Sequence, residues 1–156
     1  MAWTDLSQYT VGRFTAAMAE LLRGNFKAIG DPWTAYTPTW TASGFTKGNG
    51  TITGAWISAG KLVIYRITAT VGTTTTVGSA AYSFGLPTAA ISVNMPGGGI
   101  TVFDSSGPAV RQRDVYINTT TTVAGQDEAG AFVTGAAPFA LSSNDTLKIL
   151  GVYEAA

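Results

Sequence analysis

The chain has 156 residues, of which 46% are apolar and only 12% are charged, and its basic and acidic residues balance to a net charge of zero. Without clustered lysines and arginines, nucleic acid is not expected as a partner, and no apolar run approaches the ~20 residues that span a bilayer. Because histidine and cysteine are both absent, serine–histidine and cysteine–histidine nucleophiles, disulfides and cysteine-based zinc sites are excluded. The first residues form no secretory signal, so we expect synthesis in a reducing cytoplasm.

The low charge favours a surface that is partly covered in an assembly, because a monomer usually needs charged surface to stay soluble. A surface made polar by hydroxyl groups is the alternative interpretation. A chain of this length can bury the core of one domain.

A helical pattern runs over residues 11–29. Thr10 suits an N-cap, and Gly30 followed by Asp31-Pro32 ends the helix. The apolar side also forms a short heptad seam with Asn25 at an a-type position, where asparagine fixes register and oligomer number. Two arrangements fit: the helix packs on its own β domain, or helices of several copies meet or dock on a larger body, which we prefer. The predicted anchoring or oligomer-interface residues are Val11, Phe14, Met18, Leu21, Leu22 and Asn25.

From residue 32 the composition changes to threonine and β-branched residues, interrupted by glycine, proline, asparagine and aspartate. This divides the chain into an arm and helix (1–31) and a β domain (32–156). Short strands with no helical pattern between them predict an all-β fold, an antiparallel β-sandwich or jelly roll preceded by one N-terminal α-helix. In residues 62–71 the odd-numbered side chains are expected to face the core, and residues 58–61 to form a tight hairpin turn. The predicted strands are 33–41, 51–57, 62–71, 81–84, 100–103, 110–117, 131–133 and 147–153.

Catalytic chemistry is limited to carboxylates. A glycosidase-type pair would have to come from Asp104, Asp114, Asp127 and Glu128, although adjacent Asp127-Glu128 is most simply a solvated turn. Asp145 is predicted to cap a turn before the last strand, with calcium binding as a weaker alternative. Residues 96–99 read as a flexible loop without a P-loop lysine. We therefore expect no enzyme activity, no catalytic residues, no metal and no cofactor.

Four aromatic residues lie close together in the early β region. Core packing is the first interpretation, and a sugar-stacking platform or a subunit interface are the alternatives. The residues concerned are Trp33, Tyr36, Trp40 and Trp56.

The segment Gly30-Asp31-Pro32-Trp33-Thr34-Ala35-Tyr36-Thr37-Pro38 resembles the entry to a domain of tailed-bacteriophage virion proteins. The likeness continues at Gly48-Asn49-Gly50-Thr51, Phe84-Gly85-Leu86-Pro87 and the closing Gly151-Val152-Tyr153-Glu154. Residues 88–140 carry little of it.

Proteins of this kind are minor tail proteins, short fibres, head fibres and capsid decoration proteins, usually trimers on the particle exterior. The resemblance therefore implies a non-enzymatic virion structural protein, a β-sandwich that trimerises and contacts the major capsid protein or other virion proteins. We favour a capsid decoration (minor capsid or head fibre) protein, because an apolar arm and helix suit anchoring and no separate tip follows the β domain. The alternative is a short minor tail or tail-fibre protein that binds host-surface carbohydrate.

Overall fold

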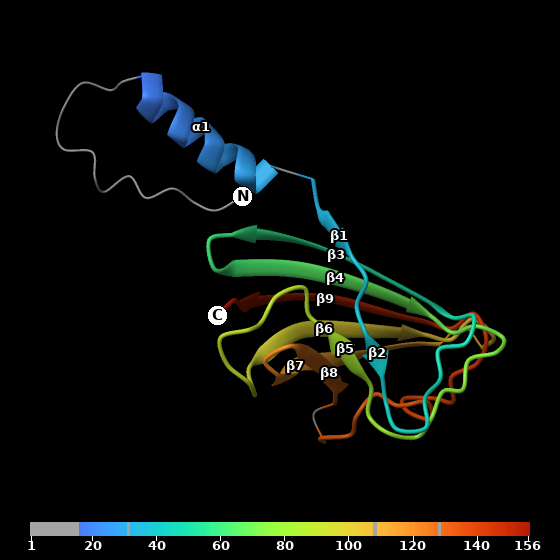
Figure 1. Ribbon diagram of the computed structural model, residues 1–156. Helices are drawn as coiled ribbons and strands as arrows, with labels where there is room; N and C mark the ends of the chain where they lie inside the picture. Colours follow the sequence, from blue (N-terminus) through green and yellow to red (C-terminus); the bar gives the residue numbers. More distant parts are fainter. Residues whose placement is uncertain (1–15, 31, 108, 128) are drawn as a thin grey trace.

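The computed structural model describes residues 16–30, 32–107, 109–127 and 129–156. This part of the chain contains one helix and nine strands, which are labelled in Figure 1. They are α1 (Ala16–Gly30), β1 (Thr34–Tyr36), β2 (Trp40–Thr41), β3 (Thr51–Ala59), β4 (Leu62–Thr70), β5 (Ser83–Gly85), β6 (Pro96–Phe103), β7 (Val110–Thr119), β8 (Thr122–Gln126) and β9 (Thr146–Glu154).

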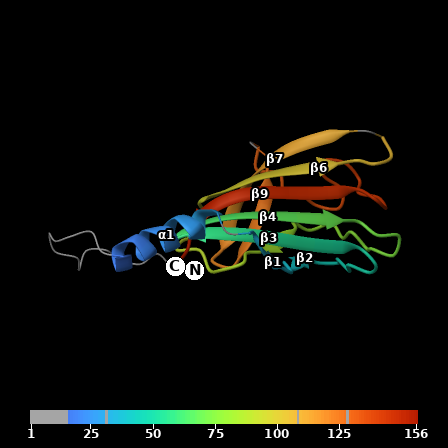
Figure 2. The same ribbon diagram turned by 90° about the horizontal axis from the view of Figure 1, so that it is seen from above.

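The nine strands form one antiparallel sheet in the order β1-β3-β4-β9-β6-β7-β8-β5-β2. The sheet curls, so that β8, β5 and β2 lie below the layer formed by β3, β4 and β9 in the view of Figure 1, and Figure 2 shows this layer from above. The predicted all-β class with an N-terminal helix is confirmed. A sandwich of two separate sheets is not confirmed, because β7 pairs with both β6 and β8 and joins the layers into one sheet.

Residues 33–41 do not form the single strand predicted for them. Strand β1 pairs with β3 at one edge of the sheet, and β2 pairs with β5 at the opposite edge. The buried Pro38 lies in the crossing, where proline provides no N–H for a strand ladder. The carbonyl of Thr39 accepts a hydrogen bond from the Gly85 N–H at 3.0 Å. One short segment therefore holds both edges of the curled sheet.

The core lies on the concave side of the sheet. As predicted, the odd-numbered residues from Val63 to Val71 face it, each at most 2% exposed. Tyr65 lies opposite Gly151 in the register of β4 and β9, and its hydroxyl donates to the Gly97 carbonyl at 2.8 Å. The predicted hairpin joins β3 to β4, with Gly60 at a φ of 62°.

Two predictions in the second half of the β domain are wrong. Residues 96–99, expected to be a flexible loop, form the first half of β6, where a bulge lies between Pro96 and Gly98. Residues 131–133, expected to be a strand, form only an isolated bridge between Phe132 and Gln126. The strand in this part of the chain is instead β8, which precedes these residues. It follows β7 after a tight threonine turn closed by a 2.6 Å hydrogen bond between Thr119 and Thr122.

Helix α1 ends at Gly30, close to the predicted end. Residues 11–15 of the predicted helix lie outside the described residues. The helix approaches the sheet at β3, and most of its length projects beyond the end of the strands (Figures 1 and 2). Its exposed side carries an ion pair between Glu20 and Arg23 at 3.1 Å, which is worth little in solvent.

Candidate functional site on the outer face of the sheet

The face of the sheet that points away from the core exposes several large apolar side chains among its polar residues. We call it the outer face, and it consists of alternate residues of β3, β4, β9, β6 and β7. Leu62, Leu150 and Val152 are 49%, 63% and 47% exposed on it, and Ile64 lies beside Val152 in the register. A β-sheet that faces water on one side normally presents polar residues there, so this face has the composition of a surface that another protein covers.

An aromatic residue extends the apolar surface toward β1. Trp33 is 36% exposed, and the Arg66 guanidinium lies 4.9 Å from the centre of its ring. This cation–π contact holds a positive charge in place on the outer face.

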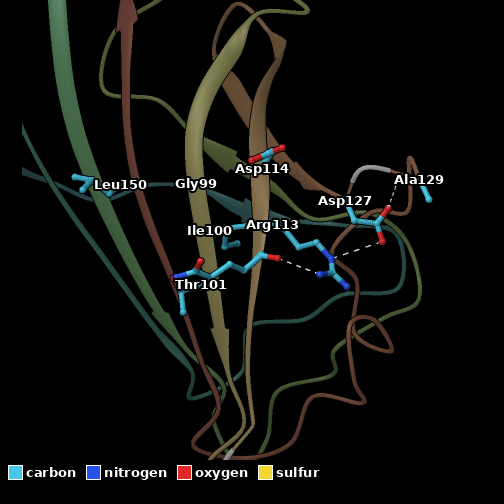
Figure 3. A pocket seen from close by; sticks show the side chains of 9 residues that line it. Gly99, Ile100, Thr101, Arg113, Asp114, Asp127, Ala129 and Leu150 are labelled. Carbon is cyan, nitrogen blue, oxygen red and sulfur yellow. Dashed lines mark hydrogen bonds and ion pairs between the residues drawn. The ribbon is translucent and has the colours of Figure 1, made fainter.

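An open groove of about 690 Å³ crosses the outer face where β6 carries a glycine. Figure 3 shows Leu150 on one side of Gly99 and Asp114 on the other. A Cβ added at Gly99 would meet only the Arg113 carbonyl, at 3.8 Å. The groove is therefore open above Gly99, between an apolar residue and an exposed carboxylate.

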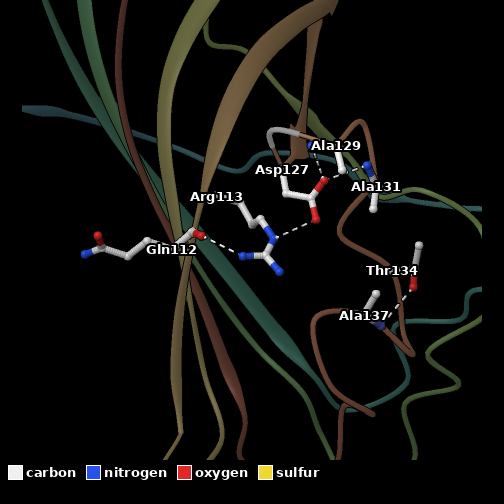
Figure 4. Close-up of polar contacts among 7 residues, drawn as sticks. All are labelled: Gln112, Arg113, Asp127, Ala129, Ala131, Thr134 and Ala137. Carbon is white, nitrogen blue, oxygen red and sulfur yellow. Dashed lines mark hydrogen bonds and ion pairs between the residues drawn. The ribbon is translucent and has the colours of Figure 1, made fainter.

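An ion pair lies beside the groove, on the face of β7 opposite to Asp114, because Arg113 and Asp114 are successive residues of this strand. The Arg113 Nε lies 3.7 Å from Asp127 Oδ2, and Asp127 Oδ1 accepts hydrogen bonds from the N–H groups of Ala129 and Ala131 at 3.0 and 2.8 Å (Figure 4). This carboxylate is thus committed to shaping a turn, as the sequence suggested.

One further carboxylate of the glycosidase hypothesis, Asp104, lies away from this groove. Asp104 lies in the β6–β7 turn, where the N–H of Gly107, followed by the hydroxyl and N–H of Ser106, lowers the pKa of its carboxyl. Glu128 lies outside the described residues. Among the described residues, the carboxylates that line the groove are Asp114 and Asp127, and Asp127 is engaged by its own turn.

Asp145 is a structural residue, as the sequence predicted. Its side chain is fully buried. One oxygen accepts hydrogen bonds from the N–H and hydroxyl of Ser105, at 2.8 and 3.0 Å, and the other from the N–H and hydroxyl of Ser142, at 2.7 and 3.2 Å. Its carbonyl also accepts from the Val71 N–H at 2.9 Å. Asp145 therefore fastens the β6–β7 turn and the end of β4 to the loop before β9. Within the described ranges, no group of acidic residues is arranged to hold a metal ion.

The four aromatic candidates have different environments. Trp40 is 5% exposed and packs against Phe45, Tyr82 and Phe84, which corrects the expectation that it could contact a glycan. Tyr36 and Trp56 pack against the core while partly buried. Trp33 alone among the four is an exposed surface residue, and Arg66 lies over its ring.

The predicted anchoring residues are only partly described. Val11 and Phe14 lie outside the described residues, as does the side chain of Asn25. Met18, Leu21 and Leu22 are half-buried on the helix.

Sequence reasoning missed the outer face as a site. Strand β9 carries apolar residues at both alternating sets of positions, with Leu147 and Ile149 buried and Leu150 and Val152 exposed. That double pattern was the available signal. Because the groove depends on the register between β9, β6 and β7, it could not be found from one strand alone.

In the part of the chain that the structure describes, no helix is long and apolar enough to cross a membrane. No protein-family model matches the chain, and neither curated proteins nor solved structures provide a significant match.

Proposed function

We propose that this chain is a non-enzymatic structural protein of a tailed-bacteriophage particle. It assembles with copies of itself on the particle exterior, as a capsid decoration protein attached through its N-terminal helix. The observation that carries the assembly proposal is the exposed apolar outer face, on a chain whose charged residues amount to only 12%.

The bacteriophage assignment is supported by the resemblance at the entry to the β domain. Two residues of this entry segment have structural roles in the β domain. Tyr36 of the motif donates a hydrogen bond to the Gly85 carbonyl at 3.3 Å, and Pro38 lies in the crossing between the two edges of the sheet. The motif therefore closes the curled domain directly after the helix.

The anchoring role is supported by the position of α1. The helix projects beyond the strands and presents a side that includes the half-buried Leu21 and Leu22. A helix of this length is marginal when isolated, so packing against other protein would stabilise it.

Purified particles test the proposal directly. Peptides of this chain are expected in density-purified particles of a phage whose genome encodes it, and antibodies against the β domain are expected to label the head exterior in electron micrographs. Particles that lack the chain, or label on the tail alone, would refute the decoration role.

A helix variant tests anchoring. Leu22→Asp is expected to reduce occupancy on particles while the thermal midpoint of the β domain stays unchanged, because a carboxylate in an apolar contact must be desolvated. Ala17→Asp, at an exposed position of the same helix, is the matched control. Normal occupancy of the Leu22→Asp protein would contradict the anchoring role.

A further inference from the structure

One row of residues across the outer face is complementary to the same row of a second copy placed in the opposite order. The strand registers place Arg66, Leu150, Gly99 and Asp114 side by side on β4, β9, β6 and β7. From β4 to β7 the row therefore presents a cation, a large apolar side chain, a depression and an anion. If the same row is laid over it in reverse, the cation meets the anion and the apolar side chain meets the depression.

The two charges of this row are not paired within the chain. Three strand spacings separate Arg66 from Asp114, which is about 14 Å and beyond the reach of an ion pair. Among the described residues, the ion pairs are Glu20–Arg23 and Arg113–Asp127. The Arg66 guanidinium instead lies on the Trp33 ring, which keeps it oriented on the outer face.

We propose that two copies of the chain pack their outer faces together about a two-fold axis, which runs parallel to the strands between β9 and β6. Arg66 of each copy then pairs with Asp114 of the other copy. Leu150, the most exposed of the large apolar side chains, enters the groove at Gly99 of the other copy. This inference rests on the proposed self-assembly and identifies the surface that performs it.

The neighbouring rows are compatible with the same axis. Lys148 lies beside Thr101 in the register, so the two-fold operation brings Lys148 of one copy opposite Thr101 of the other. By the same operation Phe103 faces Thr146. Like charges therefore do not meet in these rows.

The contact area sets the expected strength. Four strands and about four rows of side chains cover roughly 500 Å² on each copy, from the usual spacings within a sheet. The total of about 1,000 Å² is at the lower limit for a specific interface. We therefore expect a reversible dimer.

Charge exchange tests the pairing. Arg66→Asp alone and Asp114→Arg alone each place like charges opposite one another at two points, and each is expected to weaken association by roughly 10- to 100-fold. The double variant Arg66→Asp/Asp114→Arg is expected to associate like the original chain. An equimolar mixture of the two single variants is expected to form dimers with one copy of each, because both contacts are then complementary.

Sedimentation velocity measures association, with one control variant and one further test variant. Arg111→Asp makes the same charge change as Arg66→Asp, but at a position on the opposite face of β7, and is expected to leave association unchanged. Leu150→Asn tests the apolar contact independently and is expected to weaken association. Because Leu150 is highly exposed, this change should leave the folded monomer unaffected. Circular dichroism verifies that each variant is folded.

The outcomes separate this inference from the proposed function. If the original chain associates but the single charge variants associate equally well, or if it forms trimers, the two-fold contact is refuted and assembly itself stands. If the original chain stays a single copy at all concentrations, both are refuted.

Discussion

Replacing Asp145 is the most direct test of how the β domain is held together. Its buried carboxylate accepts four hydrogen bonds from two serines that lie on different loops. Asp145→Ala leaves two backbone N–H groups without an acceptor, each at a cost of about 1–3 kcal/mol. We expect a loss of about 4 kcal/mol in the free energy of unfolding, which is a large part of the 5–15 kcal/mol typical of a domain.

Asp145→Asn isolates the charge from the shape of the side chain. The amide keeps one oxygen acceptor, but its NH₂ group faces either the donors of Ser105 or those of Ser142. We expect a loss of about 3 kcal/mol, because two of the four hydrogen bonds are lost and bonds to a charged acceptor contribute about 1.5–3 kcal/mol each.

Urea unfolding followed by tryptophan fluorescence measures both variants. A lower midpoint with an unchanged slope would show a change in stability alone. Asp104→Asn is the matched control: Asp104 also accepts hydrogen bonds within a turn, but in solvent, where water replaces them, so a smaller loss is expected. If Asp145→Asn unfolded at the same urea midpoint as the unmodified chain, the reasoning would be refuted.

Three further predictions concern tight packing and titration. Gly151→Ala is expected to prevent stable folding, because its Cβ would collide with the backbone carbonyl of Gly97 and with the Tyr65 ring, whereas Gly99→Ala has room and should fold normally in a thermal melt. Burial raises the pKa of Tyr65, so folding favours its neutral form. The free energy of unfolding should therefore fall as pH rises above about 10, where tyrosine in the unfolded chain ionises. Absorbance at 295 nm should show that Tyr65 ionises only when the protein unfolds. The hydrogen bond from the Gly107 N–H is the main cause that lowers the pKa of Asp104. The contribution of the Asp104 carboxylate to stability is therefore present above the ordinary aspartate pKa and is lost as pH falls through the lower pKa of the folded state. An NMR titration should show this lower pKa, and an ordinary aspartate value would contradict the prediction.

The alternating strands were the part of the fold that the sequence revealed best. In β4 the odd-numbered residues face the core as expected, because one face is buried and the other is not. The hairpin at Gly60 and the capping role of Asp145 were also predicted, since glycine at positive φ and aspartate before a strand act locally.

Features that depend on partners distant in sequence were not predicted. Residues 33–41 look like one strand, but β1 and β2 pair with strands at opposite edges. Glycines at 97–99 suggested a loop, although the close approach of β6 to β9 excludes a side chain at Gly98, where a Cβ would collide with the Leu150 carbonyl. The candidate site has the same origin, because its central row is assembled by four strands.

The segment that crosses from β1 to β2 makes the order of folding matter. It comes early in the chain, yet β1 needs β3 and β2 needs β5, which follow later. Closure of the domain therefore depends on contacts that span many residues, and such contacts slow folding. Until the segment docks, both edge strands present unpaired backbone groups that can recruit other chains. A truncation that removes residues 1–41 should therefore yield aggregates, whereas one that removes only the helix should leave a closed, soluble domain.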